Sequence, residues 1–131
     1  GKVFRDYDAK RKGLNGFAYE RWVSYENFHR AMLAHTIATS KQRAKKKKIE
    51  HNITLEQLIK IFPNDSLCPV LGFKMIWGGD VDTSPSLDRK NNKIGYTMKN
   101  VVFISRRANT IKSNSSKEEI IKLYKWLKKN E

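Results

Sequence analysis

Asp88 and Asn109 are the two side chains whose types and positions suggest chemistry in this sequence. Asp88 ends a short extended segment, and Asn109 lies in a short helical segment that follows a β-branched strand. A hairpin followed by a helix folds these segments together, which would bring the carboxylate and the carboxamide close to each other. One carboxylate oxygen and one amide oxygen, completed by water and phosphate, would suit Mg²⁺ or Mn²⁺. Such an ion can polarise a scissile phosphate.

The spacing of these two residues is weak evidence by itself, because Asp and Asn more often serve as turn and capping residues. The elements that must position them are predicted as a strand over residues 86–89, a polar loop over 91–100, a strand over 101–105 and a helix over 106–112. This order of strand, loop, strand and helix, with further helices on both sides, predicts an α+β fold.

Helical patterns flank this unit. Residues 25–48 lack proline and glycine, and we expect a long basic helix with an apolar stripe made of Phe28, Met32, Leu33 and Ile37. Residues 54–57 and 116–119 each fit a capping box, in which a hydroxyl and a Gln or Glu three residues later bond each other's backbone. We predict that the two helices opened by these boxes are structural. Residues 1–24 are predicted as a basic aromatic arm, irregular or partly disordered, and residues 25–131 as one domain.

The charge of the chain favours a polyanionic partner. Of its 131 residues, 27 are Lys or Arg and 13 are Asp or Glu, for a formal net charge of +14. The positive charge clusters at the end of the helix over 25–48, which favours nucleic acid over a merely solubilising surface. No apolar run approaches the ~20 residues of a membrane span, so no membrane partner is expected. The residues predicted to contact the nucleic-acid backbone are Lys41, Arg43, Lys45, Lys46, Lys47, Arg106, Arg107 and Lys112.

Several short motifs follow one another in the second half of the chain. They are Cys68-Pro69-Val70-Leu71-Gly72, Ser84-Pro85-Ser86-Leu87-Asp88-Arg89, Gly95-Tyr96, Asn100-Val101-Val102-Phe103-Ile104-Ser105 and Arg107-Ala108-Asn109-Thr110-Ile111-Lys112. Together they resemble a phage-type HNH endonuclease family, which is related to the His-Me finger superfamily that includes endonuclease VII-like junction resolvases. The resemblance covers roughly residues 41–127.

This resemblance implies a fold and a function. The fold would contain a ββα-metal (HNH) finger over about residues 84–113. The function would be metal-dependent hydrolysis of DNA phosphodiester bonds, with homing or junction-directed use. DNA is the expected partner, a homodimer is an open option, and the expected location is the cytoplasm of a bacterial host cell.

The resemblance also implies a role for each matched residue. Asp88 and Asn109 would hold the metal ion, Asn100 would pin the loop against the hairpin, and Lys112 would reach phosphate. Arg89 departs from the pattern, since the superfamily usually has a water-activating histidine there and arginine stays protonated. Arg89 would instead clamp the scissile phosphate or stabilise developing charge. The predicted catalytic residues are therefore Asp88, Arg89, Asn100 and Asn109.

Arg89 leaves the general base and the activity itself open. The candidates for the base are a metal-bound hydroxide, His51, His35, His29 and Asp82. The alternative function is nucleic-acid binding without catalysis on a degenerate HNH scaffold. A third interpretation, a plain basic structural protein, does not explain why Asp88, Asn100 and Asn109 fall in register with one motif.

Cys68 is the only cysteine of the chain. Zinc-bearing members of the family hold their fold with cysteine pairs, and one cysteine cannot build such a site. We therefore expect Mg²⁺ or Mn²⁺ as the cofactor and no structural zinc. The segment from Cys68 to Gly72 is predicted to persist as a packed turn.

Overall fold

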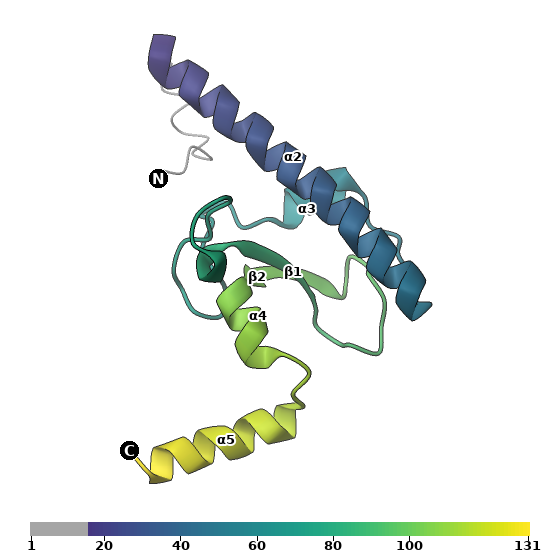
Figure 1. The fold of residues 1–131 in the computed structure, drawn as a ribbon, viewed down its shortest axis with the longest axis vertical. Helices are drawn as coiled ribbons and strands as arrows, with labels where there is room; N and C mark the ends of the chain where they lie inside the picture. Colours follow the sequence, from purple (N-terminus) through teal and green to yellow (C-terminus); the bar gives the residue numbers. More distant parts are fainter. Residues whose placement is uncertain (1–15) are drawn as a thin grey trace.

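The computed structural model describes the backbone of residues 16–131 and the side chains of residues 23–131. Its longest element is the helix α2, Gly16–Lys47, drawn from purple to blue in Figure 1. The helix begins well before residue 25, so the predicted irregular arm is wrong for residues 16–24, and residues 1–15 of that arm lie outside the described residues. Gly16 is the first residue of the helix, where glycine does not interrupt the interior hydrogen bonds.

The inner face of α2 differs from the predicted apolar stripe. Leu33 is fully buried and Met32 and Ile37 are partly buried, but Phe28 is 43% exposed. The polar residues His29 and Ser40 are buried instead. Their side chains find hydrogen-bond partners inside the protein, because Trp77 Nε1 donates to His29 Nδ1 at 2.8 Å and Ser40 Oγ donates to the Ile37 carbonyl at 3.0 Å. Buried polar side chains with hydrogen bonds of this kind are tolerated in a core, although an apolar pattern in the sequence does not predict them.

A short helix and a group of aromatic rings complete the core. The helix α3, Leu55–Ile61, begins with the predicted capping box of Thr54 and Gln57 and buries Leu58. Phe62 follows this helix and contacts the rings of His29, Trp77 and Phe103 at centroid distances of 4.6 to 6.0 Å. The hairpin is therefore attached to α2 and α3 through packed aromatic side chains.

The hairpin consists of β1, Pro85–Arg89, and β2, Val101–Ser105, which pair in antiparallel fashion with Asp88 opposite Val102. A turn of 3-10 helix, η1, Val81–Thr83, precedes β1. The helix α4, Arg106–Lys112, follows β2 directly, and the hydroxyl of Ser105 caps it by accepting from the Ala108 backbone N–H at 3.1 Å. The predicted order of strand, loop, strand and helix is confirmed, and the fold is α+β.

The two faces of the hairpin have different surroundings. Leu87 and Phe103 point into the core, whereas Ser86 contacts α4 through Asn109. Successive side chains of a strand point to opposite faces, so Asp88 shares the face of Ser86, and Arg89 shares the face of Leu87. In Figure 1 the hairpin lies between α2 and α4, which is consistent with these two environments.

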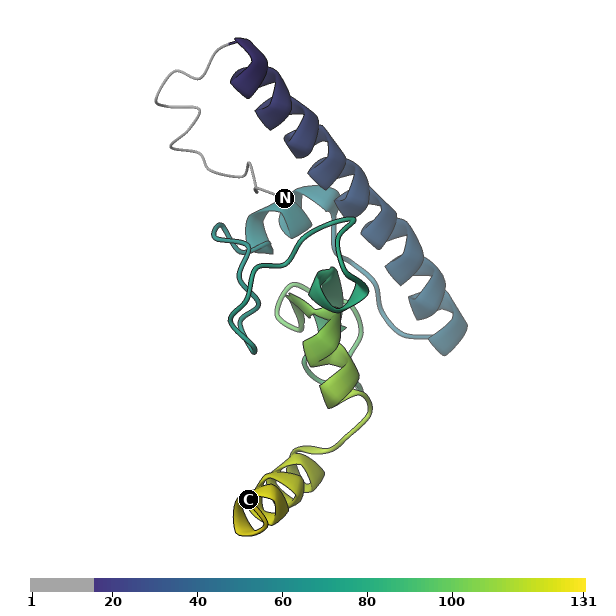
Figure 2. The same ribbon diagram turned by 60° about the vertical axis from the view of Figure 1, so that its left-hand side comes forward.

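The last helix, α5, Lys117–Lys129, begins with the predicted capping box of Ser116 and Glu119. Hydrogen bonds from the Ser116 backbone N–H and then from its hydroxyl lower the pKa of the Glu119 carboxyl. None of the residues of α5 is buried, and Figures 1 and 2 show the helix standing away from the rest of the chain. The helix forms where its capping box predicts, but among the described residues its apolar face does not pack against the core.

Gly95 brings the loop between the strands against the chain that follows α2. The Tyr96 backbone N–H donates to the Glu50 carbonyl at 2.8 Å, and the Asn52 N–H donates to the Tyr96 carbonyl at 3.0 Å. A Cβ atom on Gly95 would lie 2.2 Å from the Glu50 carbonyl oxygen and 2.8 Å from the Glu50 nitrogen. The neighbours are backbone atoms, so they cannot rotate out of the way.

We expect Gly95→Ala to lower the free energy of unfolding by about 1–3 kcal/mol, the usual range for overpacking. The measurement is urea denaturation followed by circular dichroism. Gly79→Ala is the control, because the nearest atoms to its added Cβ belong to side chains of Ile76 and Thr83, which can adjust. Equal stabilities of Gly95→Ala and the wild type would show that the two segments do not approach as closely as described.

Candidate active site

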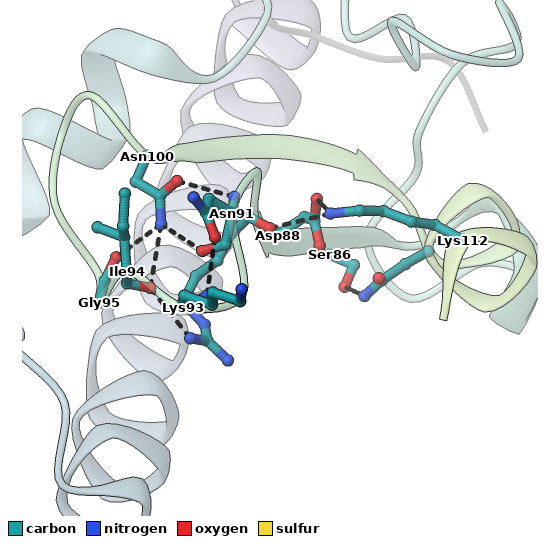
Figure 3. A network of polar contacts seen from close by, with 10 residues as sticks. Ser86, Asp88, Asn91, Lys93, Ile94, Gly95, Asn100 and Lys112 are labelled. Carbon is teal, nitrogen blue, oxygen red and sulfur yellow. Dashed lines mark hydrogen bonds and ion pairs between the residues drawn. The ribbon is translucent and has the colours of Figure 1, made fainter. Parts of the chain in front are cut away.

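Asp88 lies on β1 with its carboxylate turned toward α4. Lys112 Nζ donates to Asp88 Oδ2 at 2.6 Å and to the Arg89 carbonyl at 2.9 Å (Figure 3). The side chain of Asp88 is 12% exposed and that of Lys112 is 30% exposed, so the ion pair is partly shielded from water. The helix thus brings a cation to the carboxylate that the sequence predicts as a metal ligand.

Asn109 contacts the same face of the hairpin at Ser86, which lies two residues before Asp88 on β1. Its Nδ2 donates to the hydroxyl of Ser86 at 2.9 Å. Ser86 and Asp88 are two residues apart on one strand and therefore project from the same face. The bond to Ser86 uses the nitrogen of the Asn109 amide, which leaves the amide oxygen as the atom that a cation could approach. Asp88 and Asn109 therefore lie at the same face of the hairpin, where each has its own partner: Lys112 for Asp88 and Ser86 for Asn109.

Ser86 was not among the predicted site residues. The signal that could have identified it is the two-residue period of the strand, which places position 86 beside position 88 on the face that α4 covers. The hydroxyl holds the Asn109 amide in one orientation. This makes Ser86 a positioning residue of the candidate site.

Asn100 lies at the loop end of the hairpin, separated from the Asp88–Lys112 pair in Figure 3. It is 5% exposed. Its Oδ1 accepts from the Asn91 backbone N–H at 2.9 Å, and its Nδ2 donates to the carbonyls of Asn91, Ile94 and Gly95 at 2.9 to 3.1 Å. These four bonds pin the loop, which is the role that the resemblance implies. Its contacts are those of a positioning residue and not of a group that meets a substrate.

Arg89 points away from Asp88, as alternation along the strand requires. Its Nη1 donates to the carbonyls of Asn92 and Ile94 at 2.8 and 3.0 Å, and its guanidinium lies 5.3 Å from the centroid of the Tyr96 ring. The geometry is therefore against the prediction that Arg89 clamps a phosphate beside Asp88. In the structure Arg89 holds the loop from the opposite face of the hairpin.

The predicted general bases lie apart from the Asp88 cluster or face solvent. His29 is buried among aromatic rings, and His35 is exposed on α2. Asp82 is exposed in η1. His51 lies 2.8 Å from the Ser40 hydroxyl, with its ring 5.5 Å from that of Tyr96. Burial lowers the pKa of His51 and the charge of Lys41 adds to this, although a backbone hydrogen bond opposes both.

The predicted backbone-binding residues fall into two groups. One group is exposed at the end of α2, and the other is on α4, where Lys112 is half-buried in its ion pair with Asp88. The first group consists of Lys41, Arg43, Lys45, Lys46 and Lys47, and the second of Arg106, Arg107 and Lys112.

Cys68 forms the predicted packed turn. Its Sγ accepts from the backbone N–H groups of Leu71 and Ser105 at 3.4 and 3.3 Å, and the Gly72 N–H donates to the Cys68 carbonyl at 2.9 Å. Gly72 has a φ of +85°, which favours glycine at this corner. Burial opposes the charged form, but the hydrogen bonds outweigh it and the pKa of the Cys68 thiol is lowered. The thiol thus joins the turn to the end of β2.

No protein-family model, curated protein or solved structure matches the chain. Among the described side chains, no three or more His, Cys, Asp and Glu residues gather as a metal-binding group. A metal at Asp88 and Asn109 would instead depend on one carboxylate, one amide and solvent or substrate oxygens. Within residues 16–131, no helix is both long and apolar enough for a membrane span.

Proposed function

We propose that the protein is a metal-dependent DNA endonuclease of the HNH-like kind. The observation that carries the proposal is that Asp88 and Asn109 lie at the same face of the hairpin. Asn109 donates to Ser86 at 2.9 Å, and Lys112 donates to Asp88 at 2.6 Å. A strand, a loop, a second strand and a helix position these groups in the order that the resemblance implies.

The donor set fits a hard divalent cation. A carboxylate and an amide oxygen are ligands that Mg²⁺ and Mn²⁺ accept, with water and phosphate in the remaining positions. The ammonium of Lys112 already lies against Asp88 Oδ2, which indicates that a positive charge is favoured at this carboxylate. A bound metal ion would polarise the scissile phosphate and stabilise the leaving oxygen.

The residues of the chain would prepare this site. Ser86 accepts from the amide nitrogen of Asn109, which would leave the amide oxygen available to hold a cation. Lys112 has a long flexible side chain, and exchanging Asp88 for a phosphate oxygen would move its charge onto the substrate. Asn100 and Arg89 keep the loop in shape at the other end of the hairpin.

Nucleic-acid binding without cleavage is the second candidate function. The Asp88–Lys112 ion pair favours it, because the carboxylate is already neutralised within the protein. Arg89, at the position where the superfamily usually has histidine, is bonded to loop carbonyls and activates no water. Both functions share DNA as the partner, which the net charge of +14 supports.

Incubation of supercoiled plasmid with the protein tests the proposal. We expect nicked or linear DNA with Mg²⁺ or Mn²⁺ and none with EDTA, because the proposed reaction depends on a metal ion that polarises the scissile phosphate. A mobility-shift assay in EDTA measures binding separately. Binding without any product in either metal would reject the endonuclease and leave the second function.

A further inference from the structure

Two lysine-bearing segments that are far apart in the sequence lie next to each other in the structure. Residues 45–48 comprise the last residues of α2 and the residue that follows it, and residues 90–100 form the loop between β1 and β2. The hydrogen bonds between Tyr96 and residues 50 and 52 hold the loop against the chain that leaves α2. Gly95 allows this approach, since its missing Cβ would fall 2.2 Å from the Glu50 carbonyl. We name the exposed lysines of the two segments the basic platform: Lys45, Lys46, Lys47, Lys48, Lys90, Lys93 and Lys99.

The loop part of the basic platform is held in one shape by hydrogen bonds from three side chains, those of Asn100, Arg89 and Asn91. Asn100 bonds three loop carbonyls and one loop N–H. Arg89 bonds two loop carbonyls, and Asn91 Oδ1 accepts from the Lys93 backbone N–H at 2.9 Å. Little conformational entropy is therefore lost when the loop binds a partner. A rigid backbone favours binding, whereas lysines that serve only solubility do not need one.

The charge of the basic platform is not neutralised within the described protein. Residues 41–52 and 89–100 contain a single acidic side chain, Glu50, which accepts from Asn52 Nδ2 at 2.9 Å. None of the seven lysines forms an ion pair with another described residue. Positive charges held together without counter-charges attract a regular array of anions such as a phosphate backbone.

We propose that the basic platform binds the phosphate backbone of duplex DNA at a place separate from the Asp88 cluster. Arg89 contacts the loop through the Ile94 carbonyl and the Tyr96 ring, whereas Asp88 is turned toward α4 and pairs with Lys112 of that helix. The platform therefore contacts phosphates other than the one at Asp88, and fixes the position of the duplex without reading its sequence. The inference depends on the DNA-binding part of the proposed function and not on cleavage.

The test measures the binding of a short fluorescent DNA duplex by anisotropy in EDTA, over about 50 to 200 mM salt. The platform variant is Lys46→Gln, Lys47→Gln and Lys93→Gln together. The control variant is Lys122→Gln, Lys125→Gln and Lys129→Gln together, which removes the same charge from exposed positions on α5. Each phosphate contact that is lost should reduce the slope of log affinity against log salt by about 0.9. We expect a reduction of roughly 2–3 for the platform variant and little change for the control.

Two results would overturn the inference. Equal reductions in both variants would mean that only net charge matters, and an unchanged slope in the platform variant would mean that these lysines make no phosphate contact. A wild-type protein that does not bind the duplex would reject both the inference and the DNA-binding function. Binding through the platform without cleavage in Mg²⁺ would reject the endonuclease alone.

Discussion

Asp88→Ala is expected to reduce metal-dependent plasmid cleavage by at least about 100-fold, the scale seen when one preorganised group that stabilises transition-state charge is lost. The variant removes the carboxylate that lies on the same hairpin face as Ser86, the partner of Asn109. The measurement is the initial rate of nicking at saturating Mg²⁺. Asp88→Asn should lose a similar amount, because it keeps the shape of the side chain but removes its charge.

The effect on DNA binding should be the opposite. Loss of Asp88 releases the ammonium of Lys112 from its ion pair, so the affinity for duplex in EDTA should stay the same or rise. Asp65→Asn is a matched control, since Asp65 is an exposed carboxylate that accepts from the Leu67 backbone N–H at 3.0 Å and lies in another segment. Wild-type cleavage by Asp88→Ala would remove Asp88 from the reaction and with it the proposed metal site.

Asn100→Ala should have the largest effect on stability among the polar residues of the hairpin. The substitution removes four hydrogen bonds. The Asn91 backbone N–H loses its partner, and the carbonyls of Asn91, Ile94 and Gly95 each keep one other donor. A hydrogen bond contributes about 0.5–1.5 kcal/mol, and a buried group left without a partner costs about 1–3 kcal/mol. We expect a loss of about 3 kcal/mol in the free energy of unfolding, measured by urea denaturation.

Two companion variants separate the stabilising role of Asn100 in the loop from a role in cleavage. Asn100→Asp keeps the acceptor for the Asn91 N–H but turns an oxygen toward three carbonyls, so it should be at least as destabilising. Asn109→Ala loses one half-buried bond to Ser86 and should cost about 1 kcal/mol or less while reducing cleavage strongly. If Asn100→Ala unfolds at the urea concentration of the wild type, the loop does not depend on this amide.

Local signals in the sequence were sufficient for the hairpin unit and for the starts of α3 and α5. Val101–Ser105 is β-branched and apolar, and the two capping boxes depend on residues three positions apart, so these elements follow from neighbours in the chain. The loop-pinning role of Asn100 followed from the resemblance and agrees with its hydrogen bonds. It was also predictable that Asp88 and Asn109 lie at one face of the hairpin, because a hairpin followed by a helix has few ways to fold.

The partners of side chains across the hairpin could not be predicted in the same way. Ser86 meets Asn109 and Lys112 meets Asp88 because α4 crosses the strands at one particular register. The direction of Arg89 depends on the loop carbonyls that Asn100 gathers, which are contacts between segments. Such contacts between side chains of different segments are decided only by the packing of the elements against one another.

By itself, the sequence determined the excess of positive charge, the α+β order of elements and the two ends of a candidate site, since each depends on composition or on short-range periodicity. The tertiary structure decided that Lys112 forms an ion pair with Asp88, that Arg89 bonds the loop carbonyls, and that the hairpin loop lies against the chain that leaves α2. It also left the apolar face of α5 exposed. These outcomes depend on distances between residues far apart in the chain, and such distances are set by the packing of the whole domain and not by local pattern.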